Sequence, residues 1–126
     1  PRTRKNLDSF GLLSELESHP GIHLTEPISY IPFMNLVFNC RFVLTDSGGI
    51  QEETTYLGIP CLTLRPNTER PVTVTQGTNR LCTLKDIETM VSDIFNKSDM
   101  KNTAPDLWDG HTATRICTSI RQFLGK

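Results

Sequence analysis

Short apolar runs alternate with amphipathic segments along most of the chain, and this alternation constrains the fold more than any other feature. Each apolar run is bounded by glycine, proline or polar residues, as is typical of strands. Strands are expected at residues 21–27, 41–46, 60–64 and 79–84. Helices are expected at residues 6–18, 32–40, 49–58, 70–77, 85–96 and 113–124, with Gly58 closing the third of them.

Strands and helices that alternate over short links are typical of βαβ units and of a parallel sheet. Right-handed crossovers would then place helices on both faces of the sheet, and the run Phe42-Val43-Leu44 suits burial on both faces. The polar connection at 98–111 is expected to be a surface excursion. The predicted fold class is α/β, a Rossmann-like parallel sheet with flanking helices.

Length and charge exclude several classes of protein. The 126 residues suit one domain or part of one. Thirteen basic and fourteen acidic residues nearly cancel, which argues against nucleic acid or an anionic membrane surface as the main partner. The sequence has no apolar run of about 18 residues that could span a bilayer, and its first residues show no signal-peptide pattern.

The four cysteines favour a packing role over metal binding or disulfides. Cys40, Cys61, Cys82 and Cys117 form no CxxC pair, and each has apolar neighbours. We therefore expect reduced, buried thiols in a cytoplasmic protein. Without ligand pairs at metal spacing, among the histidines as well, we expect no metal site.

The stretch 41–58 predicts an anion-binding corner. Ser47, Gly48 and Gly49 follow an expected strand and open a helix, where glycine admits a close ligand and free N–H groups favour phosphate. Glu53 lies one turn beyond Gly49 on the same helix face, where a carboxylate could accept ribose hydroxyls. Glu52 is rotated by about 100°. In the alternative, Ser47 only caps the helix and both glutamates only favour its dipole. Spacing alone leaves both open.

Longer blocks carry a family resemblance. The segments "TDSGGIQEE" (45–53), "LGIPCLTLRPNTERP" (57–71) and "GTNRL" (77–81) resemble the non-hydrolysing UDP-N-acetylglucosamine 2-epimerases. Further segments match in the same order: 1–5, 26–36 and 108–116. The resemblance implies that residues 1–126 are the UDP-binding, C-terminal half of a two-domain glycosyltransferase-B-type architecture. This half would be truncated at its N-terminal side and would lack the N-terminal domain.

The resemblance also implies a reaction and a ligand site. UDP-GlcNAc and UDP-ManNAc would interconvert by elimination and re-addition of UDP, with no cofactor. Ser47, Gly48 and Gly49 would hold the UDP phosphates, Glu53 the ribose and Phe33 the uracil; Arg70 would lie at the nucleotide. Core packing for Phe33 and a surface ion pair for Arg70 are the alternatives, and a structural role is favoured for Glu52.

The family's proton-transferring acidic residues belong to the missing domain, so no catalytic residue is assigned and the chain alone is expected to be inactive. Three alternative functions stay open at this point. They are a UDP-sugar glycosyltransferase of the same architecture, a hydrolysing epimerase, and a non-catalytic nucleotide-sugar binding module. A homodimer is expected only for the full-length protein.

Overall fold

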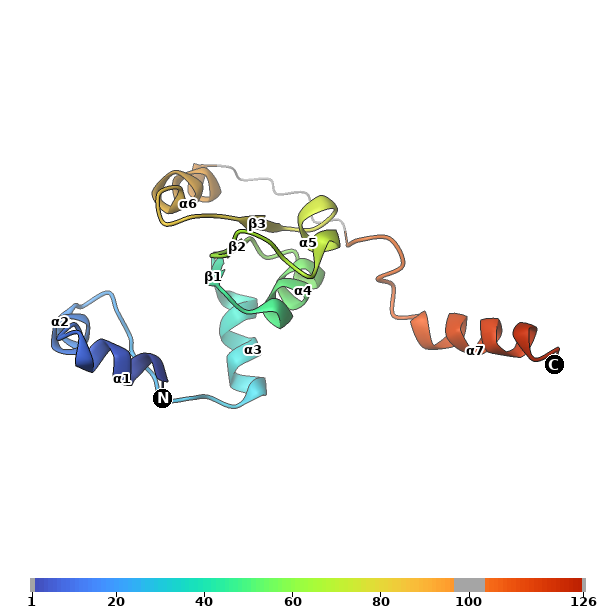
Figure 1. Cartoon of the computed structure of the whole chain (residues 1–126), viewed down its shortest axis with the longest axis horizontal. Coiled ribbons are helices and arrows are strands. Elements are labelled where there is room, and N and C mark those ends of the chain that lie inside the picture. The colour runs from blue at the N-terminus through green and yellow to red at the C-terminus, as the bar shows by residue number, and fades with distance from the viewer. Residues whose placement is uncertain (1, 97–103, 126) are drawn as a thin grey trace. The chain divides into compact units, whose positions relative to one another are not determined.

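The computed structural model describes residues 2–96 and 104–125 of the chain (Figure 1). The chain divides into two compact units, Pro1–Asn35 and Leu36–Lys126, which we call the N-terminal unit and the sheet unit. The two units are described separately below.

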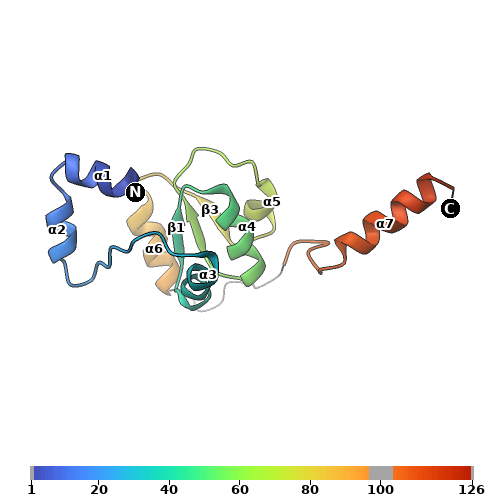
Figure 2. The same ribbon diagram turned by 90° about the horizontal axis from the view of Figure 1, so that it is seen from below.

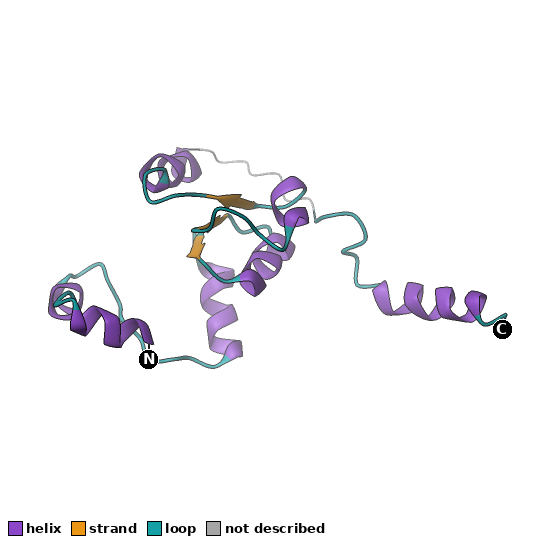
Figure 3. Cartoon of the chain, in the orientation of Figure 1, coloured by secondary structure: helices purple, strands orange, loops and turns teal. Residues whose placement is uncertain are grey.

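Three short parallel strands form the centre of the sheet unit. They are β1 (Val43–Thr45), β2 (Cys61–Thr63) and β3 (Asn79–Leu81), and they lie in the order β1-β2-β3. Val43 pairs with Cys61, which pairs with Asn79. Helix α4 (Gly48–Leu57) connects the first two strands, and α5 (Pro71–Thr75) connects the last two (Figure 3). The predicted parallel sheet built from βαβ units is confirmed.

The two faces of this sheet have different chemistry. Leu62 of β2 packs with Cys82 and with Ile94 of α6 (Ile87–Asn96) in an apolar cluster. The alternate strand positions Thr63 and Asn79 bear buried polar side chains on the other face, where α4 and α5 lie (Figure 2). Helices therefore cover both faces, as the alternating sequence predicted.

Helix α4 has the boundaries that its sequence predicts. Ser47 is extended (φ −85°, ψ 135°), and Gly48 begins the helix. Gly58 ends it in the left-handed conformation (φ 72°), and its N–H bonds to the carbonyls of Thr54 and Thr55. Helix α5 begins at Pro71, a position where the missing N–H of proline has no cost.

Two predictions for the sheet unit are wrong. Leu44 of β1 is 44% exposed, so the predicted burial on both faces does not hold at this residue, although Phe42 packs against the apolar cluster. Cys117 is exposed in α7 (Thr112–Phe123), a helix that the structure describes throughout and that contains no buried residue. The other cysteines fit the prediction better: burial raises the pKa of the Cys40, Cys61 and Cys82 thiols.

The N-terminal unit departs further from its sequence pattern. The single helix predicted at 6–18 is two helices, α1 (Arg2–Ser9) and α2 (Leu13–Ser18), because Gly11 adopts φ 70° between them. No strand forms at residues 21–27, where no described segment offers a ladder partner. The predicted helix at 32–40 is α3 (Tyr30–Asn39), which crosses the division between the units.

The expected surface excursion at 98–111 is described in part. Residues 98–103 lie outside the described residues, and residues 104–111 form neither helix nor strand. Among the helices that the structure describes, none is long and apolar enough to cross a membrane.

Candidate functional site

The corner after β1 presents backbone groups at the carboxyl edge of the sheet. The Ser47 N–H donates to Thr45 Oγ1 (3.0 Å), which fixes the turn out of the strand. Within the described chain, the Ser47 hydroxyl makes no capping bond to the helix. A serine that only caps α4 would make such a bond, so the capping alternative has no support in this geometry.

Both glycines of the corner have space above their backbone. A Cβ built at Gly49 would meet no described atom outside its own helix within 4 Å. At Gly48 the nearest atom to such a Cβ would be Glu69 Oε2, at 3.7 Å. The first turn of α4 can therefore be approached closely by a ligand, and its N–H groups and dipole favour an anion there.

Arg70 and Glu52 form an ion pair beside this helix. Arg70 Nε lies 3.0 Å from Glu52 Oε2, and both side chains are nearly half exposed. The structural role favoured for Glu52 agrees with this contact. The ion-pair alternative for Arg70 is also observed, and it holds the guanidinium against the N-terminal half of α4. The proposed ligand role of Arg70 stays a prediction.

A second pair at the corner was missed in the sequence. Arg65 Nη1 lies 3.2 and 3.1 Å from the two carboxylate oxygens of Glu69. A backbone hydrogen bond, and then the Arg65 guanidinium, lower the pKa of the Glu69 carboxyl. Glu69 thus carries its negative charge beside Gly48, and the Arg65 guanidinium compensates that charge. The pair lies in the loop between β2 and α5, where helical spacing does not apply, so no pattern in the sequence marked it.

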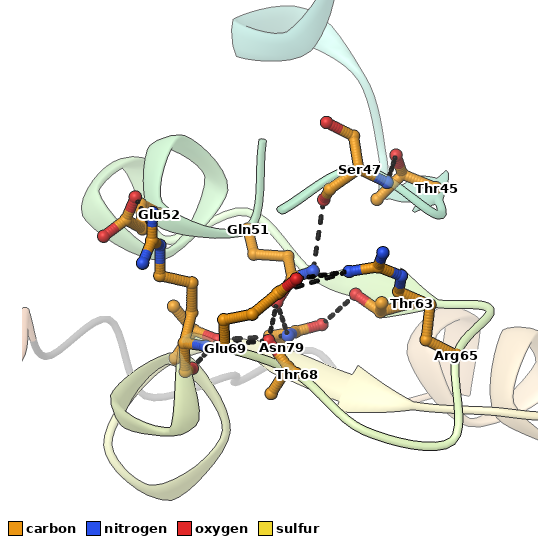
Figure 4. A network of polar contacts seen from close by, with 11 residues as sticks. Thr45, Ser47, Gln51, Glu52, Thr63, Arg65, Thr68, Glu69 and Asn79 are labelled. Carbon is orange, nitrogen blue, oxygen red and sulfur yellow. Dashed lines mark hydrogen bonds and ion pairs between the residues drawn. The ribbon is translucent and has the colours of Figure 1, made fainter. Parts of the chain in front are cut away.

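Beneath the corner lies a buried polar network that sequence reasoning also missed (Figure 4). Gln51 and Asn79 are 0% and 2% exposed, and their amides bond to each other. In a single sequence, polar residues on a strand or a helix are expected at the surface, so no pattern predicted that these two would be buried. The network consists of Gln51, Thr63, Thr68, Thr73 and Asn79, with the backbones of Ser47 and Arg70.

The structure tests the predicted roles of Glu53 and Phe33 less directly. Glu53 is half-buried on α4, one turn beyond Gly49, as the sequence implied. Phe33 is 36% exposed on α3 and belongs to the N-terminal unit, whereas the corner belongs to the sheet unit. Both roles stay predictions. Among the described residues, no group of three or more histidine, cysteine, aspartate or glutamate side chains could hold a metal ion.

Comparison with known proteins gives a consistent result. The sequence model of the family described as UDP-N-acetylglucosamine 2-epimerase matches residues 1–121. The UDP-N-acetylglucosamine 2-epimerase of Methanocaldococcus jannaschii is 41% identical over 124 residues, which are 94% of this chain and 33% of the relative. A counterpart from Methanococcus maripaludis is 48% identical over 81 residues, or 64% of this chain and 22% of that protein.

Solved structures agree. The M. jannaschii enzyme superimposes with a TM-score of 0.79 over 94% of this chain and 34% of its own. Its complex with UDP-GlcNAc and UDP, at the same identity and coverage, gives 0.75. The Neisseria meningitidis enzyme bound to UDP-GlcNAc is 31% identical and gives 0.62 over 97% of this chain and 34% of its own.

This chain spans about a third of the length of these relatives. The named relatives and solved structures carry the same description as the family model. The chain belongs to the UDP-N-acetylglucosamine 2-epimerase family.

Proposed function

We propose that this chain binds the UDP part of a nucleotide sugar at the corner formed by Ser47, Gly48 and Gly49. The observation that carries the proposal is the open first turn of α4, where a Cβ at Gly49 would meet no described atom outside its own helix within 4 Å. Structures of relatives at 41% and 31% identity hold UDP-GlcNAc or UDP, which supports the same ligand here. Glu53 would accept the ribose hydroxyls, Phe33 would lie beside the uracil, and Arg70 would face the diphosphate.

The reaction proposed for the complete protein is the interconversion of UDP-GlcNAc and UDP-ManNAc without net hydrolysis. UDP leaves C1 as the C2 proton is removed, which gives a 2-acetamidoglucal. UDP then adds back after the proton has returned to the opposite face of C2. Helix α4 and Arg70 would stabilise the negative charge on the departing UDP. A base for the C2 proton is not assigned in this chain, so the chain alone would bind UDP without turnover.

The cell compartment and assembly belong to the same proposal. A nucleotide-sugar substrate and four free cysteines favour the cytoplasm, and a homodimer is proposed for the full-length protein only. For that protein, acceptor-dependent sugar transfer would instead indicate a glycosyltransferase, and release of free ManNAc a hydrolysing epimerase.

Titration of the chain with UDP by isothermal calorimetry tests the binding site. We expect saturable binding that Gly49→Val weakens by about tenfold or more, because the new side chain occupies the space left for phosphate. Glu53→Ala should weaken it similarly through lost charge-assisted hydrogen bonds. Tyr56→Val, at an exposed position near the other end of α4, is the matched control. Equal affinity in all four proteins would remove the site from this corner.

A further inference from the structure

Gln51 is a long polar side chain that is completely buried on the inner side of α4. Burial of an amide costs free energy unless its groups are hydrogen-bonded. Gln51 Nε2 donates to the Ser47 carbonyl (3.1 Å), and Gln51 Oε1 accepts from Thr68 Oγ1 (2.6 Å) and from Asn79 Nδ2 (3.0 Å). One side chain therefore joins the glycine corner, the loop after β2 and strand β3 (Figure 4).

The direction of every bond in this network is fixed by its neighbours. Thr63 Oγ1 donates to Asn79 Oδ1 (2.6 Å), so the other end of that amide donates to Gln51 and to Thr73 Oγ1 (3.0 Å). Gln51 Oε1 accepts two bonds, so Gln51 Nε2 is the group that faces the Ser47 carbonyl. Rotating the Gln51 amide by 180° would set donor against donor at Asn79, and rotating the Asn79 amide would set acceptor against acceptor at Gln51.

The same network holds the backbone of Arg70 at both ends. The Arg70 N–H donates to Thr68 Oγ1 (3.0 Å), and the Arg70 carbonyl accepts from Thr73 Oγ1 (2.7 Å) and from the Thr73 N–H (3.0 Å). The Thr68 hydroxyl also bonds to Gln51, and the Thr73 hydroxyl also bonds to Asn79. An unbroken path of hydrogen bonds thus runs from the Ser47 carbonyl through Gln51 and Thr68 to the Arg70 N–H.

Surface contacts alone are too weak to position Arg70. Its guanidinium pairs with Glu52 in a setting where both side chains are more than 40% exposed. Exposed ion pairs contribute little to stability and are screened by salt. The bonds of Asn79 to Gln51 and Thr73 are buried, the Thr68–Gln51 bond is partly buried, and only the last link to the Arg70 N–H is exposed. The buried part is the stiffer device, because a broken bond there would leave a buried polar group unsatisfied.

We infer that Gln51, together with Thr68 and Asn79, is a positioning residue that sets the distance between the Ser47 corner and Arg70 so that both can bind one diphosphate. The inference rests on the proposed function, and it assigns no direct ligand contact to these side chains. It makes the phosphate corner and the arginine a single unit, although Arg70 lies 23 positions after Ser47 in the chain.

Thr68→Val is the sharpest variant, because it keeps the shape of the side chain and removes both bonds of the Thr68 hydroxyl. We expect the Kd for UDP to rise about fivefold to tenfold, the usual effect of one buried hydrogen bond. Thr78→Val is the matched control: that hydroxyl is also buried and donates to the Ile59 carbonyl (2.6 Å), outside the network. The control should lose stability without a change in Kd.

A double-mutant cycle with Arg70→Ala separates positioning from general destabilisation. If Thr68 acts through Arg70, Thr68→Val should change the Kd by less than about twofold once Arg70 is alanine. A full fivefold to tenfold effect in that background would overturn the inference, as would an unchanged Kd for Thr68→Val alone.

NMR tests the network without reference to UDP binding. The backbone amide signals of Gly48 and Arg70 should both shift in Thr68→Val and stay in place in Thr78→Val. If the unsubstituted chain bound no UDP, the proposed function would fail, and these signals would still decide the network. Unshifted Gly48 and Arg70 amides would overturn the coupling itself.

Discussion

At the scale of single residues, Gly77 is the most constrained position in the sheet unit. A Cβ at this position would lie 2.5 Å from Thr55 Cγ2 and 2.5 Å from the Thr73 carbonyl oxygen. Gly77→Ala should therefore lower the free energy of unfolding by about 1–3 kcal/mol through overpacking. Gly49→Ala is the control, since its Cβ would meet open space. Urea denaturation of both variants measures the difference.

Thr55 offers a way to check the cause. Its hydroxyl is buried with no hydrogen-bond partner among the described residues, so Thr55→Ala removes an unsatisfied group together with one of the two clashes. The Thr55→Ala/Gly77→Ala double variant should recover part of the lost stability. Additive losses would show that Thr55 is not what excludes a side chain at residue 77.

At the scale of elements, an exposed ion pair lies at the beginning of α7. Asp109 accepts from both terminal nitrogens of Arg115 (2.8 and 2.9 Å) and from the His111 N–H (3.0 Å). The Arg115 hydrogen bonds, and then the His111 N–H, lower the pKa of Asp109 from 3.8 to about 2. A depressed pKa stabilises the folded element above pH 3.8, and this stabilisation is lost as the pH falls toward 2.

Titration of the Asp109 carboxyl carbon by NMR tests this assignment. We expect its pKa near 2 in the unsubstituted chain and higher in Arg115→Gln, though still below 3.8 because the His111 N–H remains, with earlier loss of the first turn of α7 on acidification. Arg121→Gln, in the last turn of the same helix, should leave the titration unchanged. An unperturbed Asp109 in all three proteins would contradict the ion pair.

Elements were predictable from the sequence where local signals agreed with tertiary packing. Helix α4 was bounded correctly because Gly58 must adopt a positive φ to end it. The helix at 6–18 was not bounded correctly. Its apolar residues keep helical spacing past Gly11, but the backbone leaves the helical conformation at that residue. The strand at 21–27 failed for a different reason, since a strand needs a partner that local sequence cannot supply.

The candidate site was predictable in outline for the same reason. A local sequence signal predicts the corner, because an expected strand ends directly before the small residues Ser47, Gly48 and Gly49. Gln51 and Asn79 carry no such signal. They lie 28 residues apart in the sequence, and their role depends on hydrogen bonds to each other and to threonines of other segments. Long-range hydrogen bonding between neutral side chains leaves no periodic trace in a single sequence.

At the scale of the whole molecule, binding and turnover should separate. The chain spans about a third of its relatives, and no base for the C2 proton is assigned in it. We therefore expect the purified chain to bind UDP but to leave UDP-GlcNAc unchanged. Proton NMR of the sugar in D₂O would detect either epimerisation or exchange of the C2 proton. Appearance of UDP-ManNAc would place a complete catalytic set within these 126 residues.

The unequal faces of the sheet have a consequence for how the sequence can change over time. The Leu62 face is held by shape and volume, so aliphatic exchanges there should be tolerated with repacking. The Asn79 face is held by donor and acceptor direction, which few single substitutions besides threonine to serine preserve. Substitutions should therefore be unevenly distributed between the two faces. We expect more sequence variation beneath α6 and little in the layer between the sheet and α4.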